Sequence, residues 1–471
     1  MKKLYTCLLS VLLAGLVILG AISLADKDKT VSLVENRKLA SKPAFSWSAL
    51  FNGTYIRNLE TYYADTFPFR DSLLTVNKKL NRFYYYSGGG SNYLAISYNG
   101  GAEKGGEALH TAEQAASEAA GKETTAAAAD GTTASGAAET TSAETTTAAE
   151  TTAKPDPEIA LPGEDQATAI GTIIVVGDNA MDIPTATYSV IDKYAAAVDD
   201  LAKAMGSGVQ TYSLVTPNSG EFYSPESFHT GSHSQKDMID YCYSKMDKSV
   251  KTVDAYAALR EHADEYIYFR TDHHWTALGA YYAYTAFCKS AGLEAVPLAD
   301  FQTGTYDSFL GSMYTYTSGY AQSDALKKHP DTLTYYLPTH ETHAKYYADT
   351  TLTNGVPVSV VYTKLSDSVS NKYLCFIGGD TPICIIDTDV GNGKTCMVLK
   401  ESYGNAFIPF LTSHYSKIVV VDPREFNHGS KPSLDIAAFG KSQGVNDLIV
   451  INYPFMINNT SYIDWLERLV K

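Results

Sequence analysis

The most constraining feature of this sequence is a regular alternation of short apolar runs with helical patterns between residue 172 and the C-terminus. Runs with the length and composition of strands are Thr211–Val215, Tyr266–Phe269, Cys396–Leu399, Ile418–Val421 and Asp447–Ile451. Helical patterns separate or follow them at Ser189–Met205, Lys236–Met246, Val253–Glu265, Ala277–Ser290, Ala406–Tyr415 and Ile463–Val470. This order predicts an α/β domain whose parallel sheet has helices on both faces and a ligand site beyond the carboxyl ends of its strands.

Residues 101–160 have the composition of a disordered insertion. Within 121–153, 22 of 33 residues are Ala or Thr, and no aromatic residue occurs between Tyr98 and Tyr188. Such a stretch buries too little apolar surface to offset the entropy of ordering it, and its clustered Thr and Gly argue against the alternative, an Ala-rich helix. The flanking runs Tyr93–Ile96 and Thr172–Val176 both look like strands, so we expect them to pair as a hairpin across the insertion.

The N-terminus carries a membrane signal. Lys2 and Lys3 precede 22 uncharged residues, Leu4–Ala25, a run long enough to cross a hydrocarbon core of ~30 Å. A cleaved signal peptide is the alternative, because Ser23-Leu24-Ala25 resembles a cleavage site. We therefore expect an anchor or signal (1–25), a juxtamembrane segment with the start of the folded domain (26–100), the insertion (101–160) and the α/β domain (161–471). The domain would be extracellular, held at the cell membrane by a single span or secreted.

Charge and cysteine content exclude several classes of protein. The formal net charge of −15 argues against a nucleic-acid-binding protein, and 11 acidic against 3 basic residues in 101–158 account for −8 of it. The six cysteines have no CxxC spacing, which excludes a zinc site or a disulfide framework, so we expect buried thiols. A disulfide among Cys375, Cys384 and Cys396 stays open.

A carboxylate and an imidazole lie two residues apart where a predicted strand leads into a predicted helix. In Thr271-Asp272-His273-His274-Trp275-Thr276, Asp272 can orient and charge the ring of His274, which is the orienting half of a nucleophilic triad. Two alternatives remain. Asp272, His273 and His274 could instead bind a metal, or Asp272 or Thr276 could simply cap the helix.

A serine follows another predicted strand. In Lys400–Ala406, Ser402 sits in a strand-to-helix turn, where backbone N–H groups and a helix dipole can stabilise an oxyanion, and Gly404 gives the turn backbone freedom. An ordinary helix cap is the alternative. Because the carboxyl ends of parallel strands share one edge of a sheet, Ser402 and the Asp272/His274 pair together predict an acyl-transfer site.

The run Asp272-His273-His274-Trp275 resembles the motif of the DHHW family of Gram-positive bacteria, which is similar to the alginate O-acetyltransferase-like SGNH hydrolases. The resemblance covers nearly the whole chain outside the insertion. Further matching segments are Glu35-Asn36-Arg37 to Pro43, Asp65–Arg70, Phe309-Leu310-Gly311-Ser312, and Ser402-Tyr403 through Ile408–Leu411.

This resemblance implies an SGNH-hydrolase-like fold and a role for each motif residue. Asp272 would be the orienting acid, His274 the general base and Ser402 the nucleophile. Backbone N–H groups near Tyr403 would stabilise the oxyanion, with Asn405 and Asn218 as further candidates. Asn218 follows Thr211–Val215 and has an alternative interpretation as a turn residue beside Pro217. The Gly-Asp-Ser of ordinary SGNH enzymes is absent, because Glu401 precedes Ser402.

From these features we expect a membrane-anchored, extracellular O-acetyltransferase or acetylesterase acting on a cell-envelope or secreted polysaccharide, without cofactor or metal. The excess of tyrosine, 35 against 17 Phe, fits a polysaccharide-facing cleft. The resemblance also implies a membrane-bound partner that exports acyl groups. The alternative is a non-catalytic envelope protein that binds glycan or an assembly partner.

Overall fold

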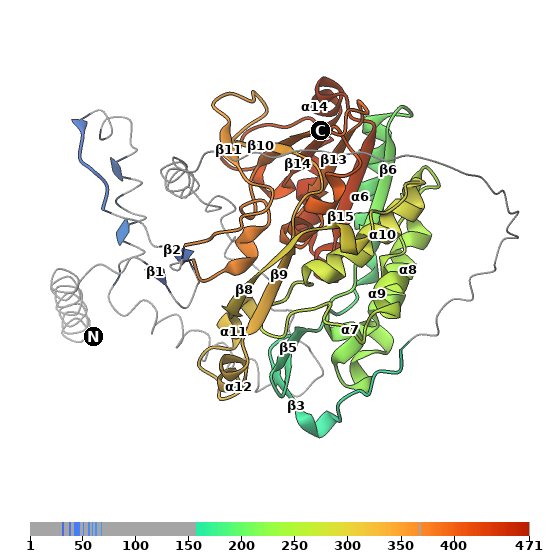
Figure 1. Cartoon of the computed structure of the whole chain (residues 1–471), viewed down its shortest axis with the longest axis vertical. Helices are drawn as coiled ribbons and strands as arrows, with labels where there is room; N and C mark the ends of the chain where they lie inside the picture. Colours follow the sequence, from blue (N-terminus) through green and yellow to red (C-terminus); the bar gives the residue numbers. More distant parts are fainter. Residues whose placement is uncertain are drawn as a thin grey trace, which may run out of the picture.

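A mixed eight-stranded sheet forms the centre of the molecule (Figure 1). The computed structural model describes residues 157–366 and 369–470, together with scattered positions between 31 and 67. The strand order is β11-β10-β12-β14-β13-β15-β6-β7. These strands are β6 (Gln210–Val215), β7 (Val250–Thr252), β10 (Thr342–Tyr347), β11 (Val356–Val358), β12 (Ile383–Thr388), β13 (Thr395–Lys400), β14 (Lys417–Val421) and β15 (Asp447–Asn452).

Only one part of this sheet is parallel. β14, β13, β15, β6 and β7 run parallel to one another, as the sequence predicts, whereas the pairs β14–β12, β12–β10 and β10–β11 are antiparallel. The prediction of a wholly parallel sheet is therefore wrong for these three strands. Parallel neighbours need a crossover of a dozen or more residues, usually a helix. In the described part of the chain between β10 and β12, the helical structure is one short turn, Lys372–Cys375.

Helices cover both faces of the sheet, as predicted. In β13, Cys396 and Val398 belong to a buried cluster with α9, α10 and α13, whereas Met397 and Leu399 belong to a second cluster with α6, α8, α14 and α16. This alternation is the one expected of a strand buried on both faces. The helices are α6 (Tyr188–Met205), α7 (Gly220–Tyr223), α8 (Gln235–Lys245), α9 (Ala255–Glu261), α10 (Ala277–Ala291), α11 (Ser312–Thr317), α12 (Ser323–Lys328), α13 (Ile408–Leu411), α14 (Ile436–Gln443), α15 (Pro454–Ile457) and α16 (Thr460–Arg468).

Smaller antiparallel units accompany the main sheet. A three-stranded sheet of β3 (Ala167–Ile170), β4 (Ile173–Val176) and β5 (Asn179–Asp182) lies at the end of the molecule away from the C-terminus (Figure 1). β8 (Thr303–Phe309) pairs with β9 (Asp331–Tyr336), and β1 (Val31–Ser32) with β2 (Arg37–Lys38). β3 and β5 occupy the two edges of β4 along its whole length. The predicted hairpin between β4 and Tyr93–Ile96 is therefore wrong; Tyr93–Ile96 itself lies outside the described residues.

Two other predicted elements differ from the structure. Tyr266–Phe269 is not a strand of the sheet, and it contributes a single bridge between Tyr268 and Trp275. The helix predicted over Ala406–Tyr415 is only α13, preceded by a 3-10 turn, Ser402–Ala406. The apolar run 4–25 and the insertion up to residue 156 lie outside the described residues. Among those that are described, no helix is both long and apolar enough to cross a bilayer.

The five cysteines of the described region are all buried and unpaired: Cys242, Cys288, Cys375, Cys384 and Cys396. The disulfide left open among the last three is therefore not formed, and these thiols act as small apolar side chains of the core.

Candidate active site

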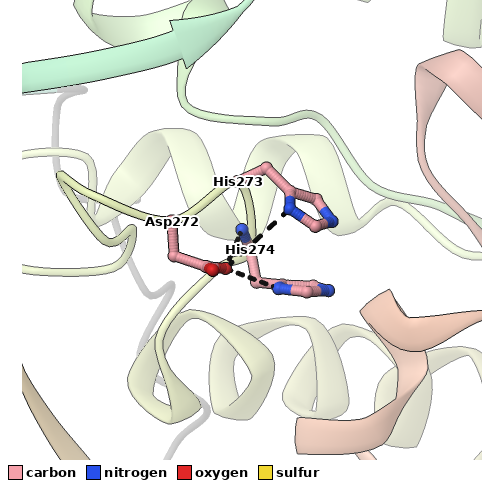
Figure 2. Close-up of side chains that lie close together, drawn as sticks. All are labelled: Asp272, His273 and His274. Atoms are coloured by element: carbon pink, nitrogen blue, oxygen red, sulfur yellow. Dashed lines mark hydrogen bonds and ion pairs between the residues drawn. The ribbon is translucent and has the colours of Figure 1, made fainter. Parts of the chain in front are cut away.

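The loop before α10 holds Asp272 against the ring of His274. Asp272 Oδ1 lies 2.6 Å from His274 Nδ1 and accepts the backbone N–H of His274 at 3.0 Å. Figure 2 shows the carboxylate directed at one edge of the ring, while the other ring nitrogen points away from it. Both side chains are buried, at 3% and 6% exposure, so water competes little for this hydrogen bond.

Neighbouring elements fix the position of Asp272. Its second oxygen, Oδ2, accepts the backbone N–H of Ser312 at 2.8 Å, where α11 begins. A β-carbon on Gly311 would stand only 2.3 Å from Asp272 Oδ2, so the close approach of this backbone requires glycine. The fully buried carboxylate of Asp331 accepts the N–H and the hydroxyl of Thr271 at 2.8 and 2.6 Å. The base loop, Thr271–Thr276, is therefore anchored from two other segments of the chain.

Ser402 meets the free edge of the His274 ring. Its Oγ lies 2.9 Å from His274 Nε2, although the two residues are 128 positions apart in the chain. Ser402 follows β13 and opens the 3-10 turn, with Glu401 as the capping residue. Unlike its neighbours Glu401 and Tyr403, Ser402 is only partly buried. The structure thus brings Asp272, His274 and Ser402 into one continuous hydrogen-bonded chain.

Aromatic side chains hold the base loop together with Glu401–Ala406, a segment called the nucleophile turn after the role predicted for Ser402. The indole N–H of Trp275 donates to the carbonyl of Tyr403 at 2.9 Å, and the Tyr403 hydroxyl donates to the carbonyl of His273 at 3.1 Å. The ring of Tyr373 stacks on His274 at a centroid distance of 3.9 Å. Tyr373, Tyr403 and the adjacent Tyr453 are all buried, so these tyrosines support the site from within and form no exposed glycan-facing surface.

Two residues of the base loop have strongly shifted pKa values. Burial alone would raise the pKa of Asp272, but the positive charge of His274 and the hydrogen bonds from His274 and Ser312 lower it far below the usual range. Burial, followed by the neighbouring charge of His274, lowers the pKa of His273 to about 3. At neutral pH Asp272 is therefore ionised and His273 is uncharged.

Asp272, His273 and His274 are close enough to hold a metal ion, with their ligand atoms within 4.8 Å of one another. Hydrogen bonds already engage both ring nitrogens of His274, one with Asp272 and one with Ser402. His273 Nδ1 lies 2.6 Å from Ser312 Oγ. A metal ion bound through these atoms would have to break these hydrogen bonds. The three side chains are therefore better explained as members of a hydrogen-bonded network than as metal ligands.

Two of the three predicted oxyanion residues already donate to carboxylates. The N–H of Tyr403 donates to Glu401 Oε2 at 2.9 Å. Asn405 is buried and donates to Asp380 at 3.1 Å, and Asn218 is buried in its own turn, accepting from the N–H of Gly220 at 2.9 Å. The side-chain oxygen of Asn218 therefore serves its own turn, whereas its Nδ2 is buried without a hydrogen-bond partner among the described residues, and Asn218 stays a candidate oxyanion donor. Among the hydrogen bonds of residues 157–366 and 369–470, none involves the N–H of Ser402 itself.

A buried ionic network lies next to the nucleophile turn. Lys400, fully buried at the end of β13, pairs with Asp380 at 2.7 Å. Arg424, after β14, pairs with Asp380 and Asp422, both at 2.6 Å. Burial opposes the ionisation of Asp380, but Lys400 and Arg424 hold its pKa well below the usual range. Two positive and two negative charges balance here, and this network holds Asn405.

Sequence reasoning missed the residues that support the site. Ser312 and Gly311 lie in a segment that the family resemblance marks, but nothing in the sequence indicates that they bind Asp272. Asp331 and Asp380 are single carboxylates without a local motif. Tyr373 is one of 35 tyrosines, and no spacing distinguishes it.

Comparison with known proteins identifies the family of this chain. The family model described as DHHW protein matches residues 35–421, so the chain belongs to the DHHW family. A crystal structure of a DHHW family protein from Eubacterium siraeum is 30% identical, covers 65% of this chain and 98% of that one, and has a TM-score of 0.56. Bacillus cereus PatB1 is 19% identical over 60% of this chain and 96% of its own, with a TM-score of 0.49. The O-acetyltransferase domain of Pseudomonas putida AlgJ is 13% identical over 59% and 90%, with a TM-score of 0.35. No curated protein matches.

Proposed function

We propose that this protein is a serine-dependent O-acetyltransferase or acetylesterase acting on a cell-envelope or secreted polysaccharide. The chain of hydrogen bonds Asp272–His274–Ser402 carries this proposal, because a partly exposed serine beside a buried, oriented imidazole is the arrangement that nucleophilic catalysis requires. The polysaccharide acceptor follows from the sequence resemblance.

The steps follow from the two distances around His274. Ser402 Oγ attacks the carbonyl carbon of the acetyl donor while its proton passes to His274 Nε2, and the ionised Asp272 stabilises the resulting imidazolium. His274 then gives this proton to the departing alcohol, which leaves an acetyl ester on Ser402. A sugar hydroxyl or water attacks that ester, its proton goes to His274, and Ser402 is regenerated.

Among backbone groups, stabilisation of the oxyanion falls to the N–H of Ser402. It has no described acceptor and lies at the start of the 3-10 turn, where the first N–H groups of a helical segment lack partners. The N–H of Tyr403 becomes a second donor only when Glu401 releases it.

The test is a comparison of the purified protein with its Ser402→Ala variant. We expect the wild type to hydrolyse 4-nitrophenyl acetate and to form a one-to-one adduct with a sulfonyl fluoride, detected by intact mass. Ser402→Ala should lose both, and Ser442→Ala, on the exposed surface of α14, should lose neither. Retained hydrolysis in Ser402→Ala would refute the proposal. A wild type that forms no adduct but binds glycan as well as Ser402→Ala does would favour the non-catalytic envelope protein.

Transfer and hydrolysis differ only in the acceptor. Mass spectrometry of an oligosaccharide incubated with the protein and an activated acetyl ester separates them, because transfer adds an acetyl group to the sugar while hydrolysis leaves the sugar unchanged. If activity instead depends on a stoichiometric metal that chelators remove, a metal-dependent hydrolase at Asp272, His273 and His274 replaces the serine mechanism.

We further propose that residues 1–25 anchor the protein in the cell membrane with its C-terminal domain outside, next to a membrane partner that exports acyl groups. The apolar run behind Lys2 and Lys3 supports this placement. Protease added to intact cells should then digest the domain, and alkaline extraction should leave the protein in the membrane fraction. Digestion only after cell lysis would contradict the proposal.

A further inference from the structure

Glu401, directly before the nucleophile, is a buried carboxyl with an unusual set of partners. Its side chain is 1% exposed. Oε2 accepts the N–H of Tyr403 at 2.9 Å and lies 3.5 Å from Ser402 Oγ. Oε1 is buried and has no hydrogen-bond partner among the described residues. A charged oxygen without a donor is costly in such a place, so the fold favours the neutral acid.

The charges around Glu401 do not compensate for its burial. The groups that face it are His274 from the base loop, Asp380 before β12, Arg424 after β14, and the hydroxyls of Tyr373, Tyr403 and Tyr462. Arg424 is already paired with Asp380 and Asp422. Burial raises the pKa of Glu401 to about 7, and Asp380 adds to the rise against the lowering effects of Tyr403 N–H, Arg424 and His274.

Ionisation of this carboxyl would act on the reacting hydroxyl. The neutral acid holds the N–H of Tyr403 and leaves the proton of Ser402 directed at His274 Nε2, 2.9 Å away. A carboxylate at 3.5 Å is a competing acceptor for the same proton. It also places a negative charge beside the oxygen and the oxyanion on which charge develops during attack.

We propose that Glu401 is a positioning residue of the nucleophile turn, which leaves the Ser402 hydroxyl to His274 when neutral and disables the site when ionised. This inference rests on the proposed serine mechanism. It predicts that activity falls as pH rises through the titration of Glu401, in addition to any change caused by the base.

The experiment measures kcat/KM for 4-nitrophenyl acetate from pH 5.5 to 9 in the full chain, after subtraction of the Ser402→Ala rate at each pH. For the wild type we expect a descending limb of about tenfold per pH unit above neutrality. Glu401→Gln keeps an acceptor for Tyr403 N–H but cannot ionise. Its ratio of kcat/KM at pH 9 to that at pH 6 should exceed the wild-type ratio by about 100-fold, with the change in kcat and not in KM. Glu401→Asp can ionise, so its kcat/KM should again fall as pH rises above neutrality.

The matched control is Asp182→Asn at the end of β5. Burial and the nearby charge of Asp272 also raise the pKa of Asp182 to about 7, so it is a second carboxyl close to Asp272 and His274 that could produce the limb. We expect Asp182→Asn to keep the wild-type profile. A limb that survives in Glu401→Gln, or disappears in Asp182→Asn, overturns the inference and leaves the serine mechanism intact. A uniform loss of rate across the whole pH range in Glu401→Gln assigns Glu401 a purely structural role and also overturns it. Activity retained in Ser402→Ala refutes the mechanism itself.

Discussion

The two loops that meet at the site differ in how completely their polar atoms are satisfied. In the base loop, both oxygens of Asp272 accept hydrogen bonds, and Asp331 and Ser312 hold the neighbouring backbone. In the nucleophile turn, Glu401 Oε1 and Asn405 Oδ1 are buried without a partner among the described residues. The difference teaches that the orientation of the base is fixed by the fold, whereas the electrostatic state of the nucleophile turn is open to adjustment by pH.

The largest effect on activity should come from removing the negative charge of Asp272 in the base loop. In Asp272→Asn one acceptor oxygen becomes an NH2 group, which cannot accept from His274 or from Ser312 N–H, and the charge that stabilises the imidazolium is lost. We expect kcat to fall by about 10³–10⁴-fold, as for the corresponding change in serine proteases. Steady-state kinetics with 4-nitrophenyl acetate checks this, with circular dichroism to verify folding. A loss of less than about tenfold in a folded variant would mean that the rigid base loop is not needed for catalysis.

In the nucleophile turn, replacing the Glu401 carboxyl should change the free energy of unfolding. The pKa of Glu401 is raised from 4.5 to about 7 in the folded protein, so folding favours the protonated form. The stabilisation is complete below pH 4.5 and is lost as pH rises through about 7, to a total of about 3 kcal/mol. Glu401→Gln should therefore gain stability relative to the wild type between pH 5 and pH 8. Urea unfolding at the two pH values measures the difference, and equal differences at both would contradict a buried titrating group.

Gly311→Ala tests how tightly the base loop is held. The new methyl group would contact the Asp272 carboxylate at 2.3 Å, so the carboxylate must move and activity should fall by roughly 10–100-fold. Gly208→Ala is the matched control, because a β-carbon there has no neighbour within 4 Å. Equal activity of the two variants would show that the base loop adapts and is not rigid.

The smallest effect is expected at the end of the base loop. The Thr276 hydroxyl caps α10 by accepting the N–H of Gly279 and donates to the carbonyl of Tyr266. Thr276→Ala should lower the free energy of unfolding by about 1 kcal/mol and change kcat less than threefold. A large loss of activity with unchanged stability would show that this residue positions His274 directly.

The sequence predicts the part of the fold that follows regular periodicity. β6, β13, β14, β15 and the long helices α6, α8 and α10 coincide with their apolar patterns to within a few residues. β8 and β9, with Thr, Tyr and Asp at most positions, lack such a pattern because one or both of their faces meet water. β12 is antiparallel to β10, and the described residues between these strands contain no long helix. The sequence does not indicate which strand pairs with β12, so the direction of β12 could not be predicted.

The site could be predicted to a similar degree. Asp272, His274 and Ser402 are recognisable because their chemistry and their places after apolar runs agree. The backbone oxyanion donors are not, because the carboxyl group that occupies the N–H of Tyr403 belongs to Glu401, whose conformation is set by packing. Asp331 and Asp380 act across 60 and 20 residues of sequence, and no local pattern encodes such contacts.

The bond from the Trp275 indole to the Tyr403 carbonyl joins segments 128 residues apart. Closing so long a loop is slow and yields its stabilisation only when the sheet between the segments has formed. In an incomplete or misfolded chain the Ser402 hydroxyl therefore has no imidazole beside it and is no more reactive than any other alcohol. Labelling by a serine-directed reagent would for this reason count native molecules alone, and its time course during refolding would report when the central strands assemble.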